Sequence, residues 1–229
     1  MLFRYTCFRL LVLSLGFFLP ALAWAQGSPN WNWVQQGPSA VASGGRGIVV
    51  APSGNVFVTG YFTHTLTLGA TTLTTDSTDA FVAKYTAGGQ VLWAQKFGSS
   101  GQGVGCQVVA DANDNCYVAG MFRGQAQVAG SLLQSQSDGD EFIVKYSAQG
   151  TPLWGQRYSD LAPFFYDYLF KTRYFPLASQ NMHLALDAQG NLYTAGWFRN
   201  TVTRGTATFT AQGTNTDVLV VKYNAQGQV

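Results

Sequence analysis

The chain has 229 residues, of which 47% are hydrophobic and 10% are charged, with 13 lysines and arginines against 11 aspartates and glutamates. Two of the basic residues, Arg4 and Arg9, lie within residues 1–25, so the rest of the chain carries 11 basic and 11 acidic residues and no net formal charge. Nucleic-acid affinity depends on an excess of positive charge, and we therefore expect no nucleic-acid partner.

Residues 1–25 are predicted to be a signal peptide. Arg4 and Arg9 supply a basic start, residues 10–22 are apolar, and Ala23-Trp24-Ala25 matches a small-x-small cleavage site. An uncleaved membrane helix is the alternative, although the apolar run is shorter than the roughly 20 residues that a span needs. We expect a secreted or cell-surface protein with no transmembrane segment in the mature chain.

Residues 26–229 form a repeat region with three copies, at about 31–92, 93–153 and 154–229. Short apolar runs recur in each copy between turns rich in Gly, Asn and Asp, which predicts strands joined by tight hairpins. A stretch rich in Thr, Gln and Ser follows Phe62, Phe122 and Phe198 and is expected to form a small hairpin of its own. No run has a sustained helical period, so we expect an all-β fold of four antiparallel strands per copy.

Four strands per repeat with an aromatic signature indicate a β-propeller blade. The segments Gly54-Asn-Val-Phe-Val-Thr-Gly60, Asp79-Ala-Phe-Val-Ala-Lys-Tyr85 and Gly89-x-x-x-Trp93 resemble the SBBP-type bacterial β-propeller repeat. This resemblance implies a propeller fold and an extracellular setting, and it brings no common catalytic residues. The repeated Trp93 and Trp154 are expected to be buried between neighbouring blades.

The expected strands add up to about three blades, whereas propellers have roughly four to eight. Residues 31–36 read as a lone fourth strand, and Leu219–Tyr223 as a third strand without a fourth. An incomplete or truncated propeller is therefore predicted, with the first of these segments beside the first blade and the second at a free edge.

An aromatic insert at 159–180 is the candidate ligand-binding segment. The link from a fourth strand to the next first strand lies on the same face as the second-to-third links, which places the insert beside His64 and Arg123. Aromatic rings and cations suit a glycan or protein ligand; alternatively, the insert covers an exposed edge or core. The candidate ligand-binding residues are Phe164, Phe165, Tyr166, Tyr168, Lys171, Arg173 and Tyr174.

Three other patterns have structural explanations. Asp111–Asn115 and Asp187–Asn191 loosely resemble calcium loops, but they lack the bidentate glutamate of an EF-hand and are expected to be hairpin turns. Lys84, Lys145 and Lys222 recur beside Asp79, Asp140 and Asp217, which predicts an ion pair or a hydrogen-bonded bracket in each copy rather than a functional ring of charges. Cys106 and Cys116 fall on two arms of one hairpin, too far apart for a disulfide, and are expected to be buried free thiols.

No catalytic residue, metal site or cofactor is predicted. His64, His183 and Glu141 are the only residues of their types in the repeat region and occupy dissimilar positions, and no catalytic motif occurs. We expect an exported, non-catalytic β-propeller repeat protein that acts as a binding or scaffold module. The alternative is a propeller enzyme, a polysaccharide lyase or hydrolase, that uses the insert face.

Overall fold

The computed structural model describes residues 32–98, 100–135, 140–157, 182–198, 200–213 and 216–229. The chain divides into Met1–Asn32 and a compact unit, Trp33–Val229, and the account below concerns the second unit. All regular elements within the described ranges are β-strands, so the all-β prediction is confirmed. None of the described segments forms a helix that is long and apolar enough to cross a membrane.

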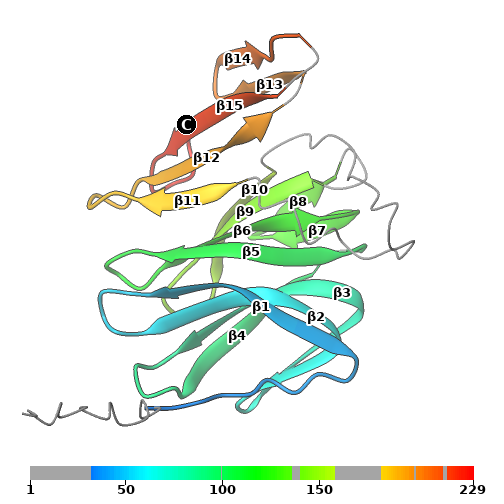
Figure 1. Cartoon of the computed structure of the whole chain (residues 1–229), viewed down its shortest axis with the longest axis vertical. Coiled ribbons are helices and arrows are strands. Elements are labelled where there is room, and N and C mark those ends of the chain that lie inside the picture. Colours follow the sequence, from blue (N-terminus) through cyan, green and yellow to red (C-terminus); the bar gives the residue numbers. More distant parts are fainter. Residues whose placement is uncertain (1–31, 99, 136–139, 158–181, 199, 214–215) are drawn as a thin grey trace, which may run out of the picture. The chain divides into compact units, whose positions relative to one another are not determined.

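The first sheet has four antiparallel strands in sequence order (Figure 1). They are β1 (Ala42–Val50), β2 (Val56–Leu68), β3 (Thr71–Tyr85) and β4 (Val91–Phe97). Burial alternates along residues 65–68 of β2, which reflects the two-residue period of side chains on a strand, whereas residues 79–85 of β3 are all buried. Gly54, with a φ of 85°, and the Gly54 N to Ala51 O hydrogen bond of 2.9 Å close the turn between β1 and β2, as its composition predicts.

The second sheet repeats this arrangement in the order β5-β6-β9-β10, and the third contains β11-β12-β15. The strands of the second sheet are β5 (Gly103–Ala110), β6 (Cys116–Phe122), β9 (Asp140–Tyr146) and β10 (Pro152–Arg157). Those of the third are β11 (His183–Leu186), β12 (Leu192–Phe198) and β15 (Asp217–Tyr223). The prediction of four antiparallel strands per copy therefore holds for the first two sheets, and three strands form the third within the described ranges.

Each copy also has the predicted small hairpin. In the second and third copies it is a separate two-stranded sheet, formed by β7 (Gln125–Val128) with β8 (Ser131–Gln134) and by β13 (Thr201–Arg204) with β14 (Ala207–Thr210). In the first copy the hairpin continues β2 and β3 without a break, and Leu68 pairs with Thr71 at its tip. The hairpins thus extend the second-to-third connection of each sheet.

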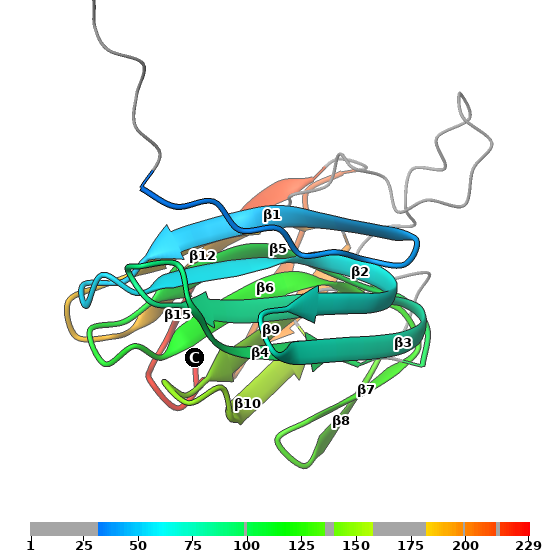
Figure 2. The same ribbon diagram turned by 90° about the horizontal axis from the view of Figure 1, so that it is seen from below.

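Apolar side chains fill the spaces between consecutive sheets. One core joins the first and second sheets and includes Phe57, Val82 and Phe142. Another joins the second and third and includes Tyr117, Ile143 and Val221. The first strands of consecutive sheets are neighbours in space: β5 contacts both β1 and β11. It lies beside β1 in both views (Figures 1 and 2).

The segment before β1 packs on the first sheet without forming the predicted strand. Residues 33–38 have no strand assignment, and residue 31 lies outside the described ranges. The Trp33 ring nevertheless stacks on Tyr85 with 6.3 Å between centroids, and its Nε1 donates to Ala87 O at 3.0 Å. The prediction that this segment lies beside the first sheet is confirmed. The predicted strand was wrong for residues 33–36, because pairing with β2 begins only at Pro38, whose O accepts from Thr67 N, and at Ser39, which bridges to Leu66.

Candidate functional site

The repeated tryptophans are Trp33, Trp93 and Trp154. Each of them connects a sheet to the sheet or chain segment that precedes it. Trp93 of β4 donates from Nε1 to Ala148 O in the second sheet at 2.9 Å, and Trp154 of β10 donates to Ala225 O beside the third at 3.2 Å. Both side chains lie between neighbouring sheets as expected, but they are partly buried instead of fully buried. Their indole N–H groups must reach the turns at the sheet margin, and this position leaves part of each ring exposed.

The predicted pairing of each repeated lysine with the aspartate of its own strand is wrong. Lys84 Nζ lies 3.0 Å from Asp114 Oδ2 in the second sheet and 3.1 Å from Ala148 O. Lys145 Nζ likewise donates to Ala225 O at 3.1 Å. An aspartate five positions earlier on a strand points to the opposite face, so Lys84 and Lys145 take their partners from the neighbouring sheet, whereas Lys222 Nζ lies 3.5 Å from Asp187 Oδ2 of its own sheet.

Asp79 and Asp140 pair instead with basic residues on the fourth strand of their own sheet, whereas Asp217 Oδ2 accepts from Gln212 N. Asp79 Oδ2 lies 3.6 Å from Lys96 Nζ, and Asp140 Oδ2 lies 3.1 Å from Arg157 Nη1. Both carboxylates are almost fully buried, with side-chain exposures of 1% and 0%. The two ion pairs therefore lie at equivalent ends of the first and second sheets.

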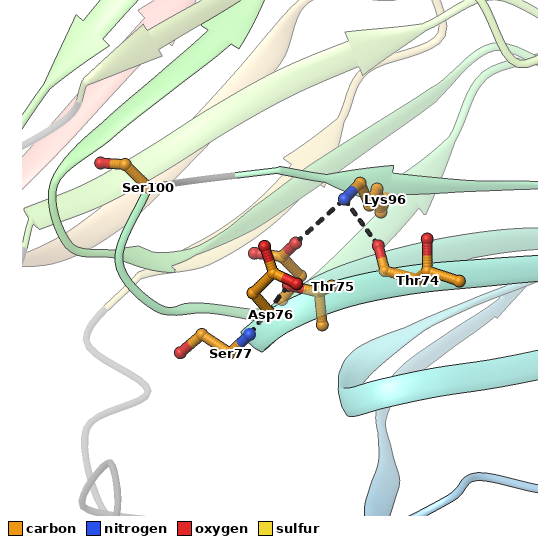
Figure 3. A pocket seen from close by; sticks show the side chains of 7 residues that line it. Thr74, Thr75, Asp76, Ser77, Lys96 and Ser100 are labelled. Carbon is orange, nitrogen blue, oxygen red and sulfur yellow. Dashed lines mark hydrogen bonds and ion pairs between the residues drawn. The ribbon is translucent and has the colours of Figure 1, made fainter.

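A polar depression of about 320 Å³ lies at this end of the first sheet (Figure 3). Its floor comes from an irregular stretch of β3, where the register with β2 shifts between Thr63 and Thr65. Residues 75–77 of β3 face only His64 of β2, whose φ is 65°, so β3 bulges outward there. The lining residues are Thr74, Thr75, Asp76, Ser77, Asp79, Lys96 and Ser100.

Lys96 is an exposed basic group of this pocket. Its Nζ donates to Thr74 O at 2.7 Å and approaches Asp79, while its side chain keeps 41% exposure. Asp76 and Ser100 are exposed at the rim, and Ser77 N donates to Thr75 Oγ1 at 3.3 Å (Figure 3). An ammonium, hydroxyls and a carboxylate arranged in this way can hydrogen-bond a polyol or a peptide group.

The pocket adjoins the link between the first and second sheets. Ser100 N donates to Gln125 O at 2.8 Å, and Arg123 N donates to Gln102 O at the same distance. This link therefore lies beside the second-to-third connection of the next sheet. The expected position of the aromatic insert beside His64 and Arg123 falls on residues outside the described ranges. In the sequence, the corresponding link after Arg157 contains the aromatic insert, and the next strand, β11, begins at His183.

The insert itself lies outside the described residues. This applies to all of the predicted ligand-binding residues, so the structure does not place them. They are Phe164, Phe165, Tyr166, Tyr168, Lys171, Arg173 and Tyr174.

The calcium-like segments are hairpin turns, as predicted. Asp111 Oδ1 accepts from Asn113 N and Asn115 N at 3.0 and 2.9 Å, and its Oδ2 accepts from Asn115 Nδ2. Asp187 makes the same set of bonds in the third sheet, and the Asn191 side-chain bond is the main reason why its pKa falls to about 2. Their oxygens are thus engaged by the turn, and no group of three metal-ligating side chains occurs among the residues placed by the structure.

The two cysteines are free thiols, as expected. Cys116 is buried, whereas Cys106 is only partly buried and occupies the register shift between Gly105 and Gln107. Burial raises the pKa of the Cys106 thiol to about 11. A thiol with such a pKa is a poor nucleophile at neutral pH.

The residues considered for catalysis lie on different sheets. His64 is exposed on β2, and Glu141 is buried on β9. His183 Nδ1 lies 2.9 Å from Gln107 Nε2, a contact between β11 and β5. Each of the three therefore has separate surroundings.

Comparison with known proteins finds a distant relative. An uncharacterized WD repeat-containing protein of Acanthamoeba polyphaga mimivirus is 27% identical over a 134-residue alignment that covers 52% of this chain. The aligned part spans only 10% of that relative. No family model matches the chain. WD repeats form four-stranded propeller blades, so the similarity agrees with a β-propeller type of repeat.

The sequence did not lead us to predict the pocket, although it contains a pattern that indicates the ion pair between Lys96 and Asp79. A basic residue follows each of the last two repeated tryptophans by three positions, Lys96 after Trp93 and Arg157 after Trp154. This recurrence indicates a partner for the buried aspartates. The bulge in β3 has no comparable signal, because it depends on the pairing register of two strands.

Proposed function

We propose that the chain is an exported β-propeller repeat region of the SBBP type and acts as a non-catalytic binding or scaffold module. The sheets are its blades. The observation that carries this proposal is the recurrent contact between an indole N–H and a turn carbonyl, made by Trp33, Trp93 and Trp154. Identical contacts at successive sheets are what repeated blades around an axis require.

Ligand binding is assigned to the end of the sheets that holds the Lys96 pocket and the sheet-to-sheet links. Polar groups converge there, and the link before β5 is anchored to the next sheet through Ser100. The aromatic insert occupies the equivalent link position in the sequence. A glycan suits this combination, since hydroxyls bond to the polar pocket and sugar faces stack on aromatic rings.

A glycan array probed with the full chain tests the proposal. We expect binding to at least one polysaccharide class, about tenfold weaker binding for Lys96→Ala, and loss of binding when Asp160–Ala178 is deleted. Arg46→Ala is the charge-matched control, because Arg46 lies over the Tyr61 ring on another part of the first sheet. It should bind as the wild type does.

A product-release assay on the same glycans separates the two functional classes. Binding without turnover agrees with a binding module, whereas turnover abolished by deletion of the insert supports a polysaccharide lyase or hydrolase. Absence of binding across the array, together with capture of a protein ligand that depends on Lys96, would replace the glycan with a protein partner.

A further inference from the structure

The bulge of β3 places an aspartate at the rim of the Lys96 pocket (Figure 3). Asp76 belongs to the stretch 75–77 that faces only His64 of β2, and its side chain is exposed. Within the part of the chain that the structure describes, no hydrogen bond or ion pair engages the Asp76 carboxylate. Both of its oxygens can therefore accept from a ligand in the pocket.

The repeat itself does not require this carboxylate. The buried aspartate and its basic partner recur as Asp79 with Lys96 and as Asp140 with Arg157. The position three residues before the recurrent aspartate holds Asp76 in the first copy, Ser137 in the second and Thr214 in the third. Two carboxylates that line one pocket also repel each other. Asp76 is therefore better explained by a ligand than by the stability of the first sheet.

Asp76 also decides the charge that a ligand meets. Lys96 and two aspartates line the pocket, so its lining carries one net negative charge. Lys96 and Asp79 offset each other at 3.6 Å, and the charge of Asp76 remains. Arg123 lies across the link after β4 and is not among the lining residues. The pocket therefore favours a cationic group over an anionic one.

The other lining groups suit sugar oxygens. The Lys96 ammonium has three N–H donors. One of them bonds to Thr74 O at 2.7 Å, and the 41% exposure of the side chain leaves a donor for a ligand oxygen. The described lining residues are all polar or charged, so an acetamido methyl group would find little apolar surface there. The pocket thus combines a donor for hydroxyls with an acceptor for a cation.

We propose that this pocket recognises an amino sugar with a free amine. The Asp76 carboxylate accepts hydrogen bonds from the sugar ammonium, and Lys96 donates to a neighbouring hydroxyl or ring oxygen. N-acetylation removes the positive charge and leaves Asp76 without an ionic partner. The inference rests on the proposed function, because it names the class of glycan that the same site binds.

Binding of the full chain to three oligosaccharides of equal length tests the proposal. They are an oligomer of glucosamine, the same oligomer with every amine acetylated, and an oligomer of galacturonic acid. Calorimetry should show the glucosamine oligomer binding about three- to fivefold more tightly than the acetylated one, as an exposed ion pair provides. The galacturonic acid oligomer should bind most weakly. Added salt should reduce the preference for glucosamine, because it screens exposed charges.

Three variants assign this preference to its residues. Asp76→Asn keeps the size of the side chain and removes its charge, so the glucosamine and acetylated oligomers should bind it equally well. Asp187→Asn removes the same charge from a turn of the third sheet and is the matched control, which should keep the preference. Lys96→Ala should weaken both oligomers and also keep the preference, since Lys96 serves oxygens that the two oligomers share.

The outcomes separate this inference from the proposed function. An acetylated or anionic oligomer that binds as tightly as the glucosamine oligomer overturns the inference, and so does a preference that survives in Asp76→Asn. If such glycans bind in a manner that depends on Lys96, the proposed function stands without the amine. Absence of binding to every glycan on the array overturns both.

Discussion

The Lys84 ammonium of the first sheet lies 3.0 Å from the Asp114 carboxylate in a turn of the second, with side-chain exposures of 5% and 15%. Ser53 Oγ and Asn55 Nδ2 donate to the same carboxylate at 2.6 Å each. Burial alone would raise the Asp114 pKa, but these hydrogen bonds and Lys84 outweigh it and hold the pKa below its usual range. Asp114 thus joins three residues of one sheet to the next.

Replacement of this carboxylate should weaken the contact between the first two sheets. Asp114→Ala is expected to lower the free energy of unfolding by about 1–3 kcal/mol, because it leaves several donors without their acceptor. Denaturant titration measures the effect. Asn113→Ala, in the same turn but with an exposed side chain, should change the free energy by less than about 0.5 kcal/mol. Equal effects of the two variants would contradict the role of Asp114.

Trp154 combines packing with one hydrogen bond, and two variants separate these contributions. Its ring meets Tyr117 edge-on at 6.0 Å, and its Nε1 bonds to Ala225 O. Trp154→Ala should cost about 3 kcal/mol of unfolding free energy. Trp154→Phe should cost about 1 kcal/mol, since it keeps a ring and loses the N–H donor. An unchanged denaturant midpoint for Trp154→Ala would refute the packing between the second and third sheets.

Gly120 allows β5 and β6 to approach closely, because a Cβ at this position would overlap the Val104 carbonyl oxygen. Gly120→Ala should therefore destabilise the chain by several kcal/mol, on the order of 3–5. Gly45→Ala is the control, since its Cβ would meet only Val58 Cγ1 at 3.8 Å. Thermal unfolding compares the two, and similar transition temperatures would show that the second sheet adjusts to the added methyl group.

The Asp187 turn should make stability depend on pH in the acid range. Its folded pKa of about 2 lies below the value of about 3.9 for an unfolded chain. The contribution of Asp187 is therefore complete above the unfolded value and declines as pH falls toward the folded one. We expect the stability difference between wild type and Asp187→Asn to shrink between about pH 5 and pH 2.

A direct titration of Asp187 checks the cause of this shift. The largest contribution is the hydrogen bond from the Asn191 side chain. Asn191→Ala should therefore move the pKa upward, as followed by the carboxyl carbon signal in NMR. A wild-type Asp187 that titrates near 4 would exclude this explanation.

Local pattern was enough to predict the strands and turns of this protein. Short apolar runs at residues 56–60 and 81–85, bounded by turn residues, indicate strands, and positive-φ residues such as Gly54 and Asp114 close the turns. The hairpins after Phe62, Phe122 and Phe198 also follow from composition. These features depend on neighbours in the sequence, and each recurs in three copies, so the sequence by itself determined the repeat and its strand order.

Only the tertiary structure decided which residues meet across sheets and which remain exposed. Lys84 and Lys222 occupy equivalent positions, yet Lys84 is buried against Asp114 of the next sheet, while Lys222 is 53% exposed and pairs with Asp187 of its own sheet. Val82 and Val220 differ in the same way, at 2% and 64% exposure. Burial depends on whether another sheet covers a face, and similar local sequences carry no information about that neighbour.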